Sequence, residues 1–138
     1  MINIKENINN VEEFNLLYDS VGWGKYDNKI AQKSLENTFY SISVYDDDKI
    51  IGFGRLIGDT ICFVYIQDIM VIPEYQKNKI GTLIMNKLLE KINEIKKENH
   101  DLRVYLGASK NKEGFYEKFG FITRKEADLG EGMILNIN

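Results

Sequence analysis

The segment formed by residues 66–92, IQDIMVIPEYQKNKIGTLIMNKLLEKI, most limits what this chain can fold into. It begins as an apolar strand and reaches Pro73, the only proline of the chain, which cannot continue a strand ladder. A short polar sequence, QKNKIG, follows. Apolar residues then recur at helical spacing, which predicts the longest helix of the chain. The segment therefore predicts a strand that leads through a tight polar turn into a helix.

The size and composition of the chain limit its class. With 138 residues, 43% of them hydrophobic and 28% charged, we expect one globular domain over residues 1–138. The net charge of −3 argues against a protein that holds a nucleic-acid backbone. The longest apolar run is interrupted by Gln67 and Asp68, and residues 1–14 lack the pattern of a secretory signal. We therefore expect a cytoplasmic protein with neither nucleic acid nor membrane as its partner.

Cysteine and histidine chemistry is restricted, since the chain has one residue of each kind. Cys62 has no partner for an internal disulfide, and we expect it to pack as a small hydrophobic residue. His100 lies in the polar stretch KKENHDL, where we expect an exposed residue at a helix end. A histidine-dependent triad would have to use His100. We expect no metal site.

The periodicity of the rest of the chain predicts further helices and strands. Helices are expected near residues 9–20, 28–37, 81–99 and 111–119, with Asn9 or Asn10 as the cap of the first and Asp27 at the start of the second. Strands are expected near residues 1–8, 38–45, 49–57, 61–72, 102–108, 120–124 and 132–137. This order predicts an α/β (α+β) fold, a mixed sheet with helices on both faces.

The polar turn at residues 76–81 is the first candidate binding site. A helix start has backbone N–H groups without intrahelical partners and a partial positive charge, which together favour phosphate. Asn78 is expected to cap this helix, while Lys77 and Lys79 add charge. Two interpretations are open: an anion site, or a strand-to-helix turn solvated by two lysines. Neither a P-loop nor a G-x-G-x-x-G sequence occurs in the chain, so another carrier would have to present the phosphate.

Two sequences carry a resemblance to a known family. VIPEYQKNKIGTLIM resembles the cofactor loop R/Q-x-x-G-x-G/A of the GNAT superfamily of N-acetyltransferases, and GFYEKFGF resembles its C-terminal signature. The expected order of elements is similar over essentially the whole chain. LYDSVGWGKYD and GRLIGD also resemble a subgroup of small, stand-alone bacterial members. The resemblance implies a GNAT-like, mostly antiparallel sheet of six to seven strands.

The resemblance also implies acetyl-CoA as the cofactor and a set of residues that contact it. Gln76, Lys79 and Gly81 take the three motif places, and Lys79 replaces a glycine that would be free to adopt positive φ. Altered cofactor binding is therefore open. The implied contacts are the Val71 and Ile72 backbone with pantetheine and, elsewhere on the cofactor, Gln76, Lys77, Asn78, Lys79, Ile80, Gly81, Thr82 and Asn111.

Acetyl transfer to an amine requires a deprotonated nucleophile, a polarised carbonyl and a proton for the leaving thiolate. Tyr116 matches the tyrosine that the superfamily often uses as the acid; its alternative role is packing beside Phe115 and Phe119. The carbonyl is expected to meet an N–H near Val71. Asp68 has two open interpretations, a functional carboxylate at a cleft or the partner of a buried donor.

The acceptor site is expected over VGWGKYD, where Trp23 and Tyr26 form an apolar wall, with Gln67 nearby. The alternative is that both rings anchor the N-terminal helices to the core. Because Cys62 is expected at the far end of its strand, transfer in a ternary complex is favoured over a covalent intermediate.

The leading hypothesis is an acetyl-CoA-dependent N-acetyltransferase that acts on a primary amine of a small molecule or peptide. The alternative is a non-catalytic acyl-CoA-binding or partner-binding module on the same fold, which Lys79 keeps open. The resemblance also leaves a homodimer open.

Overall fold

The computed structural model of the protein describes residues 1–136, which fall into two compact units. The first unit is Met1–Tyr105 and the second begins at Leu106. A single domain over residues 1–138 stays a prediction.

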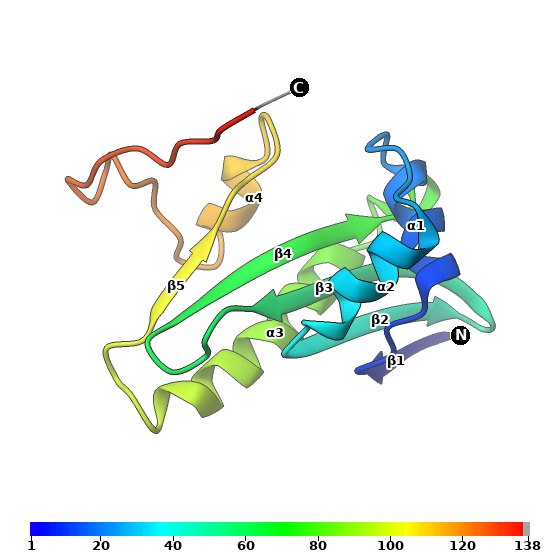
Figure 1. Cartoon of the computed structure of the whole chain (residues 1–138), viewed down its shortest axis with the longest axis horizontal. Helices are drawn as coiled ribbons and strands as arrows, with labels where there is room; N and C mark the ends of the chain where they lie inside the picture. Colours follow the sequence, from blue (N-terminus) through cyan, green and yellow to red (C-terminus); the bar gives the residue numbers. More distant parts are fainter. Residues whose placement is uncertain (137–138) are drawn as a thin grey trace. The chain divides into compact units, whose positions relative to one another are not determined.

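The first unit consists of an antiparallel meander and the helices that cover it (Figure 1). Its strands are β1 (Ile2–Glu6), β2 (Tyr40–Asp46), β3 (Lys49–Ile57) and β4 (Phe63–Val71), and its helices are α1 (Val11–Ser20), α2 (Asn28–Glu36), the 3-10 helix η1 (Pro73–Tyr75) and α3 (Ile80–Lys96). The strand β5 (Arg103–Leu106) reaches the first residue of the second unit, which contains α4 (Glu113–Glu117). The sheet order is β1-β2-β3-β4-β5, and each of the first four strands is antiparallel to its neighbours among them.

Helices cover both faces of this sheet, as predicted. The ring of Phe14 in α1 packs edge-on against Phe53 in β3, with centroids 5.7 Å apart. A Cβ built on the next residue, Gly54, would point at Ile84 and Leu88 of α3. Since successive strand residues face opposite sides of a sheet, α1 and α3 lie on opposite faces.

Local signals place α1 and α2 correctly. The Asn10 side chain accepts a hydrogen bond from the Glu13 N–H at 2.9 Å and caps α1, and Asp27 accepts from the Lys29 N–H at 3.0 Å and caps α2. The apolar face of α3 is buried as its spacing predicts; its buried residues are Ile80, Ile84, Met85, Leu88 and Ile92.

The prediction of six to seven strands is wrong for the described residues, which form five. Residues 120–124 and 132–136, expected to be closing strands, have no strand structure, and Ile137 lies outside the described residues. Met133, Ile134 and Leu135 are almost fully exposed. An apolar alternation marks only a segment that suits a strand; a ladder also requires a neighbour that pairs with it.

The expectation that Cys62 packs as a small hydrophobic residue is also wrong, because its side chain is exposed. The reason is the turn before β4, where an Asp59 carboxylate oxygen accepts the N–H groups of Ile61, Cys62 and Phe63. This turn holds Cys62 outside the core. His100 is exposed just beyond α3, as expected. No helix among residues 1–136 is long and apolar enough to cross a membrane.

The contact of Gly54 with α3 leads to a prediction. A Cβ at this position would lie 2.6 Å from Ile69 Cδ1 and 2.7 Å from Ile84 Cγ2, so Gly54→Ala should overpack the core. We expect it to lower the free energy of unfolding by about 1–3 kcal/mol in urea titrations. Gly114→Ala is the control, since no other part of the described chain lies within 4 Å of the Cβ that it would add. Equal stability of the two variants would contradict the close packing of β3 on α3.

Candidate functional site

A β-bulge in β4 organises the polar side chains of the first unit. Asp68 has φ +58°, and the pairing with β3 shifts from Arg55 opposite Gln67 to Phe53 opposite Met70. Opposed residues of an antiparallel pair share a face, so Gln67 and Met70 both face α1. The bulge turns Asp68 to the same face as Gln67. In a regular strand these two neighbours would point in opposite directions.

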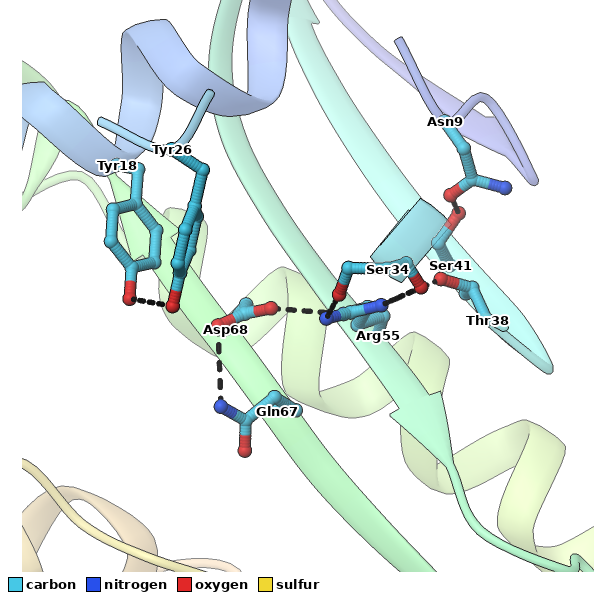
Figure 2. Close-up of polar contacts among 9 residues, drawn as sticks. All are labelled: Asn9, Tyr18, Tyr26, Ser34, Thr38, Ser41, Arg55, Gln67 and Asp68. Atoms are coloured by element: carbon cyan, nitrogen blue, oxygen red, sulfur yellow. Dashed lines mark hydrogen bonds and ion pairs between the residues drawn. The ribbon is translucent and has the colours of Figure 1, made fainter. Parts of the chain in front are cut away.

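Asp68 forms a buried ion pair with Arg55 of β3 (Figure 2). Arg55 Nε donates to Asp68 Oδ2 at 2.9 Å, and the two side chains are only 8% and 6% exposed. The guanidinium also donates to the Ser34 carbonyl and hydroxyl oxygens and to the Thr38 hydroxyl, each at 3.0 Å, while Gln67 Nε2 donates to Asp68 Oδ1 at 3.3 Å. Asp68 is thus the partner of a buried donor, one of its two predicted roles. Its catalytic role stays a prediction.

Arg55 was missed by the sequence reasoning. The signal that marks it is an arginine inside the otherwise apolar strand KIIGFGRLI. A guanidinium in such a position has to find acceptors, because burying a charge without partners is costly. Asp68, an acid inside the next apolar strand, is the partner that the sequence offers.

An aromatic cluster lies between the first two helices. The Tyr18 and Tyr26 hydroxyl oxygens are 3.1 Å apart (Figure 2). The Tyr18 ring packs against Trp23 and Tyr26, with centroids 5.2 and 5.0 Å away. Burial and the Tyr26 hydrogen bond raise the pKa of Tyr18, and the negative charge of Asp68 adds to this effect. Trp23 and Tyr26 remain 43% and 45% exposed. They therefore pack on α1 and also have surface available to a ligand.

Asn15 fixes the backbone of this cluster and was also missed by the sequence reasoning. Its amide accepts from the Tyr26 N–H at 3.1 Å and donates to the Tyr26 carbonyl at 3.0 Å and to Asn28 Oδ1 at 3.1 Å. The signal is an asparagine on the apolar face of a predicted helix, between Val11 and Tyr18. Asn15 ties the loop after α1 to the start of α2.

The turn before α3 has the backbone form expected of the motif glycine. Lys79 is the N-cap of α3 and lies in the left-handed region, with φ 62° and ψ 22°. The prediction that Asn78 caps the helix is wrong, because Asn78 lies one residue too early and its N–H donates to the Tyr75 carbonyl at 3.0 Å. Among residues 1–136, no side chain forms a capping hydrogen bond with α3. The N–H groups of Ile80, Gly81 and Thr82 therefore lie in a first turn without intrahelical acceptors.

Some of the backbone N–H and carbonyl groups at the end of β4 already have hydrogen-bond partners. The Ile72 N–H donates to the Ile51 carbonyl at 2.9 Å, and the Ile72 carbonyl accepts from the Tyr75 N–H at 2.8 Å. Because adjacent backbone units point to opposite sides of a strand, the Val71 N–H and carbonyl point away from β3. The Val71 carbonyl accepts from Gln76 Nε2 at 3.1 Å. The outward Val71 N–H is the group that fits the predicted contact with an acyl carbonyl.

The second unit holds the remaining predicted residues. Tyr116 in α4 packs edge-on against Phe115 and Phe121, with centroids 5.0 and 6.4 Å away, and burial raises the pKa of its phenol. Asn111 is exposed, with φ 68°, in the turn before α4. Tyr116 thus packs against Phe115, as its alternative role predicts, while the ring of Phe119 packs on Phe115 instead. The role of Tyr116 as an acid stays a prediction.

The strand β4 therefore carries two candidate features of a site, a polar bulge and the lead into an open helix start. The bulge of β4 brings Gln67 and Asp68 to the face that α1 covers, and the end of β4 leads into the helix start at residues 76–82. Among residues 1–136, no group of three or more His, Cys, Asp or Glu side chains is placed to hold a metal ion.

A mostly antiparallel sheet with helices on both faces, and an open helix start after its fourth strand, defines the class of GNAT-like folds. The sequence model of the acetyltransferase (GNAT) domain matches residues 12–135. The chain belongs to this family of acetyltransferases.

Similar proteins agree with this assignment. A structure from meticillin-resistant Staphylococcus aureus, described as a protein of unknown function and probable acetyltransferase, is 31% identical, covers 99% of this chain and 100% of that one, and has a TM-score of 0.88. A GNAT family protein from Streptococcus pneumoniae is 28% identical over the full length of both chains, with a TM-score of 0.79. Uncharacterised N-acetyltransferases named ycf52 from Gracilaria tenuistipitata var. liui and Pyropia yezoensis are 28% and 29% identical over 88% and 90% of this chain. The chain spans 66% and 70% of the length of these two.

The buried ion pair leads to a second prediction. Asp68→Ala should leave the Arg55 guanidinium buried beside an empty acceptor position, and we expect the free energy of unfolding to fall by about 3 kcal/mol. Glu74→Ala is the control, because its ion pair with Lys49 is exposed and long, at 3.8 Å, and should contribute less than about 0.5 kcal/mol. Chemical denaturation measures both. A loss at Asp68 no larger than at Glu74 would contradict the role of the pair.

Proposed function

We propose that the protein is an acetyl-CoA-dependent N-acetyltransferase that acts on a primary amine of a small molecule or peptide. The observation that carries this proposal is the start of α3. There Lys79 adopts the left-handed conformation of the motif glycine, and the first turn of the helix follows directly. A helix start with open N–H groups favours a phosphate-bearing ligand.

The loop formed by residues 76–82, which comprises the turn and the first residues of α3, fits a pyrophosphate group. The N–H groups of the first turn of α3 supply donors, and Lys77 and Lys79 supply positive charge. The outward Val71 N–H and the Ile72 backbone would face the pantetheine arm, with Asn111 as a further contact. The residues proposed to hold the pyrophosphate are Gln76, Lys77, Asn78, Lys79, Ile80, Gly81 and Thr82. When bound, acetyl-CoA supplies an activated acetyl thioester.

The acceptor amine is proposed to bind on the α1 face of β4. Trp23 and Tyr26 offer exposed aromatic surface there, and Gln67 offers an amide beside Asp68. Because Asp68 already accepts from Arg55, its proposed part is to act with its neighbours on the amine and not as an isolated base. Tyr116, whose phenol carries its proton at neutral pH as an ordinary tyrosine does, is proposed to donate to the leaving thiolate.

Direct transfer in a ternary complex is proposed in preference to a covalent intermediate. Cys62 precedes the first residue of β4, whereas the open helix start follows its last residue, Val71. A strand rises ~3.3 Å per residue, so the two ends of β4 lie roughly 25–30 Å apart. No thiolate of Cys62 reaches an acyl group held at the end of β4. A homodimer and a cytoplasmic location are further proposals that rest on the sequence.

Binding of acetyl-CoA is the first test of this proposal. At about a hundred times its dissociation constant, a ligand of the native state stabilises it by ~2.7 kcal/mol, which raises the melting temperature of a chain of this size by several degrees. We expect that rise in thermal unfolding with acetyl-CoA and with CoA. ATP, which has phosphates but no pantetheine, is the control. The absence of a rise with either CoA compound would refute the proposal.

Tyr116→Phe separates the enzyme from a binding module. The substitution removes only the phenolic hydroxyl, so turnover of a primary amine should fall roughly tenfold or more while the dissociation constant of acetyl-CoA stays the same. Thiol release during an amine screen measures turnover, and calorimetry measures binding. Unchanged turnover would show that Tyr116 only packs within its unit. Binding of acetyl-CoA without turnover of any amine by the unsubstituted protein would favour the module.

A further inference from the structure

The turn between β2 and β3 contacts the segment that precedes the loop at residues 76–82. The Tyr75 hydroxyl of η1 donates to Asp46 Oδ2 at 2.6 Å, across 29 positions of sequence. Lys49 Nζ lies 5.5 Å from the centre of the Tyr75 ring and 3.8 Å from Glu74 Oε2. Three contacts therefore connect this turn to η1.

Tyr75 also organises the backbone of the loop. Its N–H donates to the Ile72 carbonyl at 2.8 Å, and its carbonyl accepts from the Asn78 N–H at 3.0 Å. Asn78 is followed directly by Lys79, whose left-handed conformation starts α3. A fixed Tyr75 thus fixes the turn that determines where the first N–H groups of α3 point.

The bond between Tyr75 and Asp46 is the strongest of the three contacts. It is short and involves a charged acceptor, and such bonds are stronger than those between neutral groups. Consistently, it lowers the pKa of the Asp46 carboxyl and raises that of the Tyr75 phenol. The ion pair of Lys49 with Glu74 is exposed and long, so it contributes little.

We propose that Tyr75 is a positioning residue for the cofactor: its bond to Asp46 lets the β2–β3 turn hold residues 76–82 in the conformation that binds the pyrophosphate. This inference rests on the proposed function. A loop held in place before binding loses less conformational entropy when the ligand arrives, which strengthens binding. Tyr75 touches no reacting atom in this scheme, so it should affect the affinity for the cofactor and leave the chemical step unaltered.

The test is the dissociation constant of acetyl-CoA and of CoA, measured by calorimetry for the unsubstituted protein and for Tyr75→Phe. We expect both dissociation constants to rise about tenfold in the variant, because it lacks one charge-assisted hydrogen bond that orders the loop. With an amine substrate, KM for acetyl-CoA should rise by the same factor, while kcat and KM for the amine stay unchanged. A residue that contributes only to stability would not raise KM for acetyl-CoA while leaving kcat and KM for the amine unchanged.

Tyr45→Phe is the matched control. Tyr45 lies on β2, next to Asp46, and its hydroxyl donates to Glu13 Oε1 at 2.6 Å. Tyr45→Phe therefore loses a hydrogen bond of the same length and kind as Tyr75→Phe does. Glu13 belongs to α1, which lies on the face of the sheet opposite to α3. We expect Tyr45→Phe to lower the melting temperature without changing either dissociation constant. Asp46→Ala should reproduce the effect of Tyr75→Phe, and the double variant should lose no further affinity.

The outcomes distinguish the inference from the proposed function. If the unsubstituted protein binds acetyl-CoA and Tyr75→Phe binds it equally well, the positioning role is wrong and the proposed function stands. Equal losses in Tyr75→Phe and Tyr45→Phe would also overturn the positioning role, since they would report general destabilisation. If the unsubstituted protein binds neither acetyl-CoA nor CoA, the proposed function fails, and this inference fails with it.

Discussion

The buried pair of Arg55 and Asp68 is the interaction on which the polar side chains of the first unit depend. Each side chain would be costly to bury alone, and together they satisfy one another at 2.9 Å. The guanidinium uses its other donors on Ser34 and Thr38. This ion pair therefore connects the end of α2, and the residues just after it, to strands β3 and β4. The connection lies at the bulge, where the pairing register of β4 with β3 shifts by one residue.

The strand β4 serves both halves of the proposed site. Its bulge places Asp68 beside Gln67 on the face of α1, and three residues later the Val71 N–H points away from β3. A strand without the bulge would turn Asp68 toward α3 and into the apolar core. The distortion that interrupts the ladder is thus the feature that brings polar groups and an outward N–H to the same stretch of chain.

Lys79 shows how a departure from a family motif can leave the backbone intact. A glycine reaches φ 62° without cost, whereas a lysine reaches it at a cost of roughly 1–2 kcal/mol. The surrounding bonds of Tyr75 and Gln76 hold the turn in that form. The chain belongs to the acetyltransferase (GNAT) family although a lysine stands at this position.

The sequence by itself determined what depends on neighbours along the chain. The bounds of β3, the cap Asp27 and the buried face of α3 follow from periodicity and capping, which act within a few residues. Only the tertiary structure decided features that depend on how distant segments pair.

These features are the bulge at Asp68, its bond to Arg55, the exposure of Cys62 and the lack of closing strands among the described residues. The physical reason is that strand register and buried ion pairs are set between segments, so the pattern of either segment alone does not contain them.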